Sequence, residues 1–346
     1  MKKYYPLAVA CVALFLTSCQ KEDLNGTIAN GTTSTQASLT AASSLSNIAS
    51  GGSVNYGALI GTPSSKNSTS FQLSVADQLS ISSLRGRVLV PSTTACPLVN
   101  SKYKVILNFN RGEYSSGTPM KFFTDLTQYA KDLTTTLAAY TTVKPVVAVI
   151  ENEESNPLYY SGTAQEYINE LSTAISVMHA NGIKVADGGL GHIGLNYLVY
   201  QDFISQGKTD SAARFKALTG VAPKYAPQQE RGAFVDELIK AFTKMDLDYV
   251  NFHYKGTSPD DAYALSCVVN YLKKRTGKPV ISNELGQFDT DPNTLTAMMQ
   301  VCTAKQFPYV IWYSPDEKKG DKEMPLQHST GQLTPNGVTY KNYILN

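Results

Sequence analysis

Apolar and polar positions follow two alternating periods from residue 54 to the end of the chain. One kind of segment is short, rich in apolar and β-branched residues, and bounded by Gly, Pro or polar residues, which is typical of buried strands. Eight segments have this pattern: VNYGALIG (54–61), GRVLVP (86–91), KVILNFN (104–110), KPVVAVIENE (144–153), IKVADGGLG (183–191), LDYVNFHYKG (247–256), KPVISNELG (278–286) and FPYVIWYS (307–314).

Longer segments lie between them, with apolar residues every three to four positions, which predicts amphipathic helices. Gly182 and Gly277 stand just past two of these patterns, where helices commonly end. The link over 91–102 is too short for a good helix, and the fifth crossover carries an insertion over 196–229. The predicted helices cover 71–84, 122–140, 164–182, 234–245, 262–277 and 295–306.

This alternation predicts the fold class. A strand that returns through a crossover to the next strand pairs with it in parallel, and eight such units close into a (β/α)8 barrel, the TIM barrel. The predicted domain over 54–346 has the size of that α/β fold. An open doubly wound sheet is the competing fold, but no GxGxxG phrase follows a strand, and GGLG at 188–191 is a weak substitute.

The first 53 residues have a different composition. Residues 1–18 combine two lysines with a short apolar core over 7–15, which is typical of a signal peptide. The phrase LTSC at 16–19 resembles the cleavage box of bacterial lipoproteins, which implies a lipid on Cys19. The phrase QKED at 20–23 resembles the tag that carries lipoproteins to the outer face in some Gram-negative bacteria, which implies an outer membrane lipoprotein on the cell surface; an accidental charge cluster is the alternative. An ordinary secretory signal with a chance cysteine is the alternative. The Ser-, Thr- and Ala-rich residues 19–53 predict a flexible tether.

Composition excludes several classes of function. In a chain of 346 residues, 30 Lys and Arg nearly balance 28 Asp and Glu, which argues against a nucleic-acid partner. Beyond the signal and lipid-site cysteines, Cys96, Cys267 and Cys302 predict neither a disulfide framework nor a zinc cluster, although a bridge between Cys267 and Cys302 stays open. No HExxH or DxDxDG phrase occurs, so neither a metal nor another cofactor is predicted.

Polar residues gather where the predicted strands end, which is where barrels of this kind keep their active sites. Strand 4 ends in ENEE (151–154), strand 6 in NFHY (251–254) and strand 7 in NE (283–284). Carboxylates at the tops of strands 4 and 7 can face each other across the barrel mouth, and two carboxyl groups about 5 to 5.5 Å apart suit retaining glycoside hydrolysis. We expect repulsion between them to raise one pKa, so that this acid stays protonated near neutral pH.

The pair Asn152-Glu153 on strand 4 and Glu284 on strand 7 resembles clan A of the retaining glycoside hydrolases, which are (β/α)8 enzymes. The resemblance spans the predicted domain. It implies that Glu153 is the acid/base, Glu284 the nucleophile and Asn152 the group that binds the sugar 2-hydroxyl. Glu154 stands where many members have Pro, and strand alternation puts Glu151 on the same face as Glu153, so the choice of Glu153 rests on the resemblance.

Two further phrases extend the resemblance. Arg85 looks like the family's strand-2 arginine, with Arg87 as a competitor. The pair His253-Tyr254 looks like the strand-6 residues that contact the nucleophile, which implies that Tyr254 holds and tunes Glu284.

Aromatic residues are the last group of candidates. Trp312 occupies the place of the family's sugar-stacking tryptophan on strand 8, which implies the floor of a sugar subsite. His192, at the end of strand 5, is a candidate for a hydrogen bond to substrate, although a histidine in this place is more often a plain loop residue. One Trp is few for a protein that binds sugars, and tyrosines near the predicted strand ends are the substitutes: Tyr114, Tyr159, Tyr160, Tyr254 and Tyr313.

These observations favour a retaining glycoside hydrolase that cleaves β-linked poly- or oligosaccharides by double displacement with two Glu residues. The alternative is a non-catalytic, glycan-binding surface lipoprotein that captures carbohydrate for other glycan-uptake proteins, which the sparse Trp and the ENEE phrase favour. A barrel acting on esters or amides lacks a GxSxG elbow.

Overall fold

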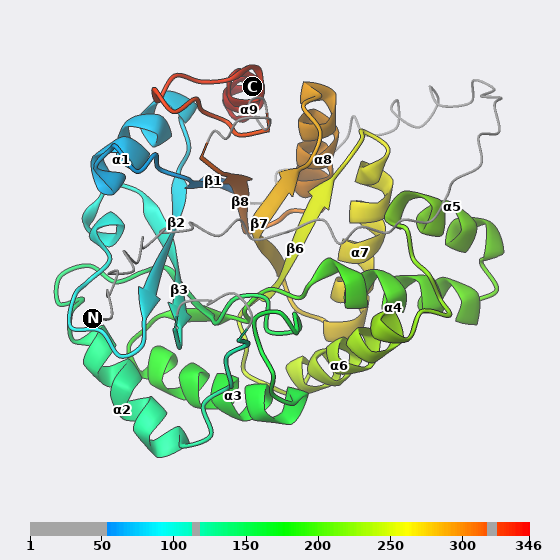
Figure 1. Cartoon of the computed structure of the whole chain (residues 1–346), viewed down its shortest axis with the longest axis horizontal. Helices are drawn as coiled ribbons and strands as arrows, with labels where there is room; N and C mark the ends of the chain where they lie inside the picture. Colours follow the sequence, from blue (N-terminus) through cyan, green and yellow to red (C-terminus); the bar gives the residue numbers. More distant parts are fainter. Residues whose placement is uncertain (1–53, 113–117, 317–323) are drawn as a thin grey trace, which may run out of the picture. The chain divides into compact units, whose positions relative to one another are not determined.

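A ring of parallel strands forms the centre of the structure, a computed structural model that describes residues 54–112, 118–316 and 324–346. In these residues eight strands pair in the order β5-β4-β3-β2-β1-β8-β7-β6, and parallel bridges from Ala186 to Tyr249 and from Leu190 to Phe252 join β5 to β6 (Figure 1). The predicted (β/α)8 barrel is therefore confirmed. The strands are β1 (Asn55–Ile60), β2 (Ser83–Leu89), β3 (Lys104–Asn110), β4 (Val147–Ile150), β5 (Lys184–Ala186), β6 (Val250–Gly256), β7 (Val280–Gln287) and β8 (Tyr309–Ser314).

Helices surround this ring (Figure 1). The link between β2 and β3 holds only a short 3-10 turn, η1 (Pro97–Asn100), as its length predicts, and the insertion in the fifth crossover forms most of α4 and all of α5. The pattern over 71–84 extends too far, because β2 already begins at Ser83. The helices are α1 (Ser68–Leu79), α2 (Leu126–Leu137), α3 (Ala164–Ala180), α4 (His192–Ser205), α5 (Thr209–Thr219), α6 (Ala226–Phe242), α7 (Asp261–Thr276), α8 (Pro292–Ala304) and α9 (Pro335–Leu345).

Local sequence explains where the helices begin and end. α3 opens on a capping box, in which Thr163 Oγ1 accepts from the Glu166 backbone N–H and Glu166 Oε2 accepts from the Thr163 N–H. Gly277 closes α7 and Gly182 follows α3, both with positive φ, as the sequence pattern predicts.

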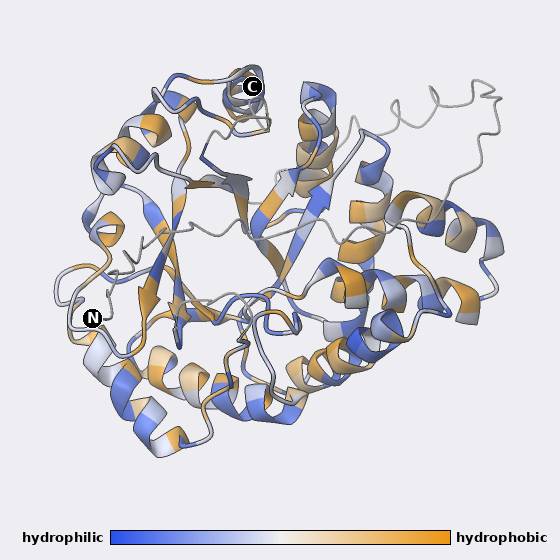
Figure 2. Cartoon of the chain, viewed as in Figure 1, coloured by the Kyte–Doolittle hydropathy of each residue, from blue (hydrophilic) through white to orange (hydrophobic). Residues whose placement is uncertain are grey.

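Two apolar layers stabilise the barrel. The larger one lies between the strands and the surrounding helices, and apolar residues line the inner faces of those helices (Figure 2). The smaller one fills the inside of the ring, so side chains at the strand ends lie above a packed floor and not over an open pore. Its buried members are Ile106, Val147, Val149, Ala186, Tyr249, Ile281 and Ile311.

Several predictions fall outside the described residues: the signal peptide over 1–18, the lipid site Cys19, the tether over 19–53, and Tyr114. Within the described ranges no helix is both long and apolar enough to cross a membrane. Cys96, Cys267 and Cys302 are free thiols there, so the bridge between Cys267 and Cys302 does not form.

Candidate active site

Glu284 reaches the barrel mouth through a bulge in β7. Asn251 on β6 pairs with Ile281 on β7, but His253, two residues further along, pairs with Glu284, three residues further along. The extra residue turns both Asn283 and Glu284 toward the side of β6 that carries His253. Asn283 Oδ1 accepts a hydrogen bond from Asn251 Nδ2 and lies 2.8 Å from His253 Nε2. Glu284 is the next residue along β7.

Glu153 comes from a strained loop at the end of β4. Glu151 and Glu153 have φ of 67° and 51°, in the left-handed region, which costs on the order of 1–3 kcal/mol for each non-Gly residue. The Glu153 N–H donates to the Gly188 carbonyl at 3.1 Å, and Asn156 Nδ2 donates to Glu153 Oε2 at 2.9 Å. This loop leaves Glu153 Oε1 at 3.0 Å from His253 Nδ1.

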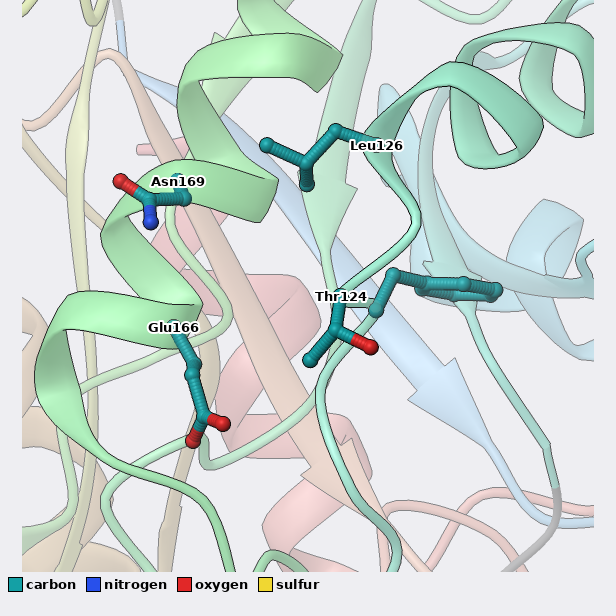
Figure 3. Close-up of a pocket in the computed structure, with 5 residues that line it drawn as sticks. Thr124, Leu126, Glu166 and Asn169 are labelled. Carbon is teal, nitrogen blue, oxygen red and sulfur yellow. The ribbon is translucent and has the colours of Figure 1, made fainter.

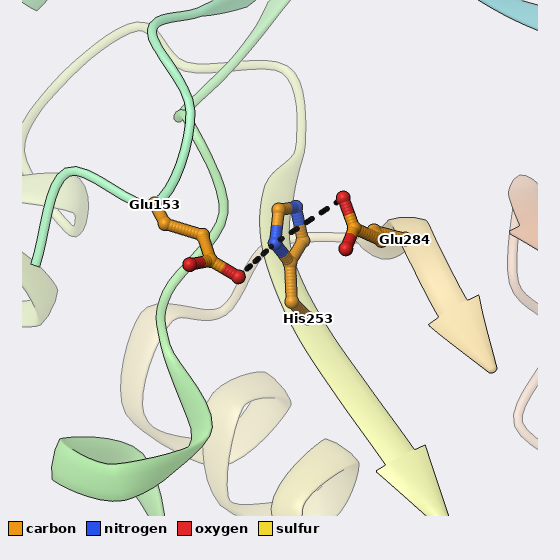
Figure 4. Close-up of side chains that lie close together, drawn as sticks. All are labelled: Glu153, His253 and Glu284. Atoms are coloured by element: carbon orange, nitrogen blue, oxygen red, sulfur yellow. Dashed lines mark hydrogen bonds and ion pairs between the residues drawn. The ribbon is translucent and has the colours of Figure 1, made fainter. Parts of the chain in front are cut away.

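The two candidate carboxylates face each other with His253 between them (Figure 4). One oxygen of Glu153, one oxygen of Glu284 and one ring nitrogen of His253 all lie within 4.8 Å of one another. All three side chains are buried. The separation of the oxygens matches retaining hydrolases, whose carboxyl groups lie about 5–5.5 Å apart, and is shorter than the roughly 6.5–9.5 Å of inverting ones.

Two cations hold the Glu284 carboxylate. Arg85 Nη1 donates to Oε2 at 2.7 Å, and Lys255 Nζ donates to Oε1 at 2.9 Å. Although burial raises the pKa of Glu284, the charges of Lys255, His253 and Arg85 together lower it far below its usual range. Glu284 is therefore ionised at neutral pH.

Glu153 does not follow the expectation of a raised pKa. Burial and the charge of Glu284 raise it, but the hydrogen bond and charge of His253 outweigh them, so the net direction is downward. Both ring nitrogens of His253 lie within hydrogen-bond distance of side-chain oxygens: Nδ1 is 3.0 Å from Glu153 Oε1, and Nε2 is 2.8 Å from Asn283 Oδ1. His253 is therefore the group that opposes protonation of Glu153 most strongly.

The structure separates Glu151 from Glu153, which the sequence pattern could not do. Glu151 turns into the protein beneath the loop, where it accepts from the Arg111 backbone N–H at 2.9 Å and from the Tyr160 hydroxyl. Burial raises the pKa of Glu151 and of its neighbour Glu170, which share a hydrogen bond. Glu151 thus supports the loop and does not reach the mouth.

Arg85, Asn152 and Asn108 form a network that links β2, β3 and the β4 loop. Arg85 donates through Nη2 to Asn152 Oδ1 and through Nε to Asn108 Oδ1 at 3.0 Å, in addition to its bond with Glu284. The competitor Arg87 is exposed. The structure therefore brings Arg85 into contact with Glu284 and Asn152 into contact with Arg85. That Asn152 binds the sugar 2-hydroxyl stays a prediction.

Tyr254 and Trp312 are not in the site. Strand alternation puts Tyr254 on the opposite face of β6 from His253, where it is buried near Asp261 and Cys267. Trp312 is completely buried against Tyr340 of α9, with ring centroids 5.9 Å apart, so no sugar can stack on it. Both expectations are wrong for one reason: each residue faces the helices and not the mouth.

Other aromatic and polar residues stand at the mouth instead. Lys255 Nζ lies 3.9 Å from the ring centroid of Tyr313 and 5.7 Å from that of Phe288, which is 47% exposed. His192 is the first residue of α4, and its side chain is exposed to solvent. The surrounding protein atoms lower the pKa of His192, and the opposing charge of Glu153 offsets only part of this effect. Lys255 is not among the residues predicted from the sequence, yet it lies two residues after His253 and therefore on the same face of β6.

Glu153, His253 and Glu284 are also the described residues closest to a metal-ligand arrangement. The donor set argues against that use, because Arg85 and Lys255 already neutralise Glu284 from both of its oxygens and would repel a divalent cation.

A separate recess of about 130 Å³ lies between the segment that leads into α2 and helix α3 (Figure 3). It shares no lining residue with the mouth. Its walls are Phe123, Thr124, Leu126, Glu166 and Asn169.

No family model and no curated protein matches this sequence. Solved structures do resemble it. A GH128 (subgroup I) endo-β-1,3-glucanase from Amycolatopsis mediterranei, in complex with laminarihexaose, has a TM-score of 0.53 and 11% identity over 84% of this chain and 99% of its own. A GH128 (subgroup VI) exo-β-1,3-glucanase from Aureobasidium namibiae has a TM-score of 0.52 and 10% identity over 83% and 96%. A fungal β-1,4-galactanase has a TM-score of 0.53 and 11% identity over 84% and 100%. At such identities the likeness shows the barrel fold.

Proposed function

We propose that this protein is a retaining glycoside hydrolase that cleaves β-linked poly- or oligosaccharides. The observation that carries the proposal is the separation of the Glu153 and Glu284 oxygens, within 4.8 Å across the barrel mouth. The fold neighbours that cleave β-1,3-glucan or β-1,4-galactan support a β-linked substrate.

In the first step Glu284, ionised by Lys255 and Arg85, attacks the anomeric carbon and forms an ester bond to it. The glycosidic C–O bond breaks, and Glu153 donates its proton to the leaving oxygen. In the second step water attacks the same carbon, its proton passes to Glu153, and the ester to Glu284 breaks. Two inversions give net retention.

His253 manages the proton in this scheme. As Glu284 loses its charge to the sugar and Glu153 becomes an anion, the imidazole at 3.0 Å stabilises the new carboxylate. In the resting protein the same contact keeps the proton near the Glu153 oxygen that must deliver it. Asn283 at the other ring nitrogen fixes the orientation of the ring.

A non-catalytic glycan-binding protein is the second candidate. It is favoured by the ion pairs that hold both carboxylates, since a lowered pKa of Glu153 is unfavourable for a general acid.

The deciding experiment uses the predicted domain, residues 54–346, with Glu153→Gln and Glu153→Ala, and Glu237→Gln at an exposed position as a matched control. On 4-methylumbelliferyl β-glycosides and soluble β-glycans, we expect the Glu153 variants to lose about 10²–10⁴-fold in rate, the usual share of general acid–base catalysis, while Glu237→Gln keeps it. Added azide should restore Glu153→Ala through a β-glycosyl azide, because the acid/base no longer screens the intermediate from anions. Equal background rates in all four proteins, with glycan binding retained, would establish the binding protein.

We also propose that the protein is an outer membrane lipoprotein anchored through Cys19. The LTSC phrase at 16–19 and the tether composition of 19–53 support this localisation. Cells expressing the full chain should incorporate labelled palmitate into wild-type protein and not into Cys19→Ala. Protease treatment of intact cells then distinguishes surface exposure from a periplasmic location.

A further inference from the structure

Three buried asparagine side chains form a network of hydrogen-bonded amides beside the candidate carboxylates. Asn108 lies on β3, Asn251 on β6 and Asn283 on β7. Asn283 joins the other two, because its Nδ2 donates to Asn108 Oδ1 at 3.0 Å and its Oδ1 accepts from Asn251 Nδ2 at 2.8 Å. The same Oδ1 lies 2.8 Å from His253 Nε2, so the network ends at the ring that contacts Glu153.

Groups with only one hydrogen-bonding role fix the direction of these amides. A guanidinium N–H only donates, and a backbone carbonyl only accepts. Arg85 Nε donates to Asn108 at 3.0 Å, so the Asn108 atom at this contact is the oxygen, and Asn108 Nδ2 donates to the Glu151 carbonyl at 2.8 Å. The same oxygen faces Asn283, which must therefore turn its NH2 group toward Asn108 and its oxygen toward His253.

Asn251 fixes the same direction independently. Its Oδ1 accepts from the Asn283 backbone N–H at 3.0 Å, and its Nδ2 donates to the Asp187 carbonyl at 3.2 Å as well as to Asn283 Oδ1. Because an acceptor faces His253 Nε2, this nitrogen carries a hydrogen whether the ring is charged or neutral. His253 Nδ1 is then the ring nitrogen that gains or loses a proton, and it lies 3.0 Å from Glu153 Oε1.

From this arrangement we infer that Asn283 is a positioning residue, which holds His253 in the Nε2–H tautomer so that Nδ1 and Glu153 Oε1 share a single proton. This inference rests on the proposed function and concerns the proton that the same site delivers. When the shared proton moves from Nδ1 to Oε1, the N–H bond breaks, an O–H bond forms, and an imidazolium and a carboxylate become a neutral ring and a neutral acid. After Glu153 has given this proton to the leaving oxygen, Nδ1 takes up another from solvent, and the imidazolium stabilises the new carboxylate.

The other tautomer would make Glu153 a poorer acid. A neutral ring with its hydrogen on Nδ1 would donate to the Glu153 carboxylate and stabilise the anion. In the Nε2–H form, loss of the shared proton instead leaves two acceptors facing each other, the bare Nδ1 of His253 and the carboxylate oxygen. The pair therefore binds its proton more tightly in the tautomer that Asn283 selects.

Other charged groups around the pair are the same in every Asn283 variant. Glu284 Oε2 lies 4.0 Å from His253 Nδ1 and is itself bound by Arg85. A shift that depends on residue 283 therefore reports its own contact with the ring. The titratable and charged groups near the pair come from β2, the β4 loop, α4, α6, β6 and β7: Arg85, Glu154, His192, Arg231, Lys255 and Glu284.

The experiment uses the full chain with isotope-labelled histidine. Long-range hydrogen–nitrogen NMR spectra distinguish a protonated ring nitrogen from a bare one, and His253→Gln assigns the signal among the four histidines. Wild type is compared with Asn283→Leu, which removes the acceptor, and with Asn283→Asp, which keeps an acceptor and adds a negative charge. Asn196→Leu, at a buried position of α4 outside this network, is the matched control. Circular dichroism verifies that each variant is folded.

We expect His253 of the wild type to keep its Nε2 hydrogen above and below the pH at which the pair loses its proton. In Asn283→Leu the neutral ring should carry its hydrogen on Nδ1, and that pH should fall by about 1–2 units, the value of one hydrogen bond to a charged group. In Asn283→Asp it should rise, because a carboxylate beside Nε2 favours the charged ring. The basic limb of kcat/KM should follow both shifts, and Asn196→Leu should leave it in place.

A bare Nε2 in the wild type, or an unchanged tautomer in Asn283→Leu, would overturn the inference. Shifts in the same direction in both Asn283 variants would also overturn it, because they would mean that Asn283 only supports the fold. These results leave the proposed hydrolase intact. If Asn283→Leu does not fold, the wild-type tautomer and the shift in Asn283→Asp decide. If wild type cleaves no glycan, the hydrolase proposal fails, and the NMR spectra alone decide whether Asn283 fixes the tautomer.

Discussion

Asp187, directly after β5, should make the stability of the folded protein depend on pH. It is completely buried, and its Oδ1 accepts the Asn251 backbone N–H at 2.7 Å. Burial raises its pKa from 3.8 to about 7, despite the backbone N–H groups of Asn251 and Gly189 that favour the charged form. The carboxyl of Glu154 lies close by, and its own pKa is raised well above the usual range by burial and by Asp187.

The direction of the effect follows from where the proton binds. The unfolded chain releases the Asp187 proton near pH 3.8, whereas the folded protein keeps it up to about pH 7. Between these values the folded state binds more protons, so the free energy of unfolding falls as the pH rises. At 1.36 kcal/mol per pK unit, the two units from pH 5 to about 7 correspond to a loss of about 3 kcal/mol.

Asp187→Asn removes this titration. Relative to wild type, the variant should therefore gain about 3 kcal/mol in free energy of unfolding between pH 5 and pH 8. Glu284 does not disturb this window, because its lowered pKa contributes stability that is complete above its unfolded value of 4.5 and is lost only at lower pH. Asp260→Asn is the matched control, since Asp260 is exposed and its side chain makes no cap bond.

Urea unfolding at each pH measures the difference. Trp312 is the one tryptophan of the chain and is completely buried, so its fluorescence reports loss of the β8–α9 packing, and circular dichroism at 222 nm reports the helices. Coincidence of the two transitions tests two-state behaviour. Parallel stability curves for wild type and Asp187→Asn from pH 5 to pH 8 would refute the reasoning.

Two further pairs of substitutions test the placement of the site. Trp312→Phe should lower the free energy of unfolding by about 1–3 kcal/mol and leave kcat/KM per folded molecule unchanged, because Trp312 is buried. Phe288→Ala should raise KM several-fold with little change in stability, because Phe288 is exposed at the mouth. The opposite pattern in glycoside assays contradicts this placement. Gly189→Ala should lower both stability and activity, because the added Cβ would lie 2.4 Å from His253 Nε2. Gly182 also has a positive φ, but no atom lies within 4 Å of its added Cβ, so Gly182→Ala should lower the free energy of unfolding by only about 1 kcal/mol in thermal unfolding. Equal effects of the two substitutions would show that backbone strain, and not the contact with His253, causes the loss.

The fold was predictable because the same unit, a strand followed by a helix, recurs along the chain. Eight short apolar runs and the helical patterns between them each carry a weak preference, but a (β/α)8 barrel is one of few ways to pair so many parallel strands. The errors lie at boundaries: the pattern at 71–84 continues from α1 into β2, and the helix predicted from 234 begins at Ala226. Apolar residues on a helix and on the strand after it face the same core, so hydrophobicity does not mark the transition between them.

The site was only partly predictable, because strand position and side-chain direction are separate properties. The sequence placed Tyr254 and Trp312 correctly at the ends of β6 and β8, but both face the helices. A period of two assigns their neighbours to the mouth, and Lys255 and Tyr313 do lie there, 3.9 Å apart from ammonium nitrogen to ring centroid. Strict alternation along β6 and β8 would have placed Tyr254 and Trp312 on the face toward the helices, and Lys255 at the mouth.

Alternation would have failed at the nucleophile candidate. With regular pairing, His253 would lie opposite Asn283, and Glu284 would face the helices beside Tyr254, away from the mouth. The bulge in β7 adds one residue before His253 pairs with Glu284, and the same shift appears against β8 between Ser282 and Leu285. Nothing in PVISNELG distinguishes a bulged strand from a regular one, because the bulge depends on the contacts of β7 with β6 and β8. Periodicity alone would therefore place Glu284 on the face toward the helices. The resemblance to known hydrolases predicted Glu284 as a residue of the mouth in spite of this.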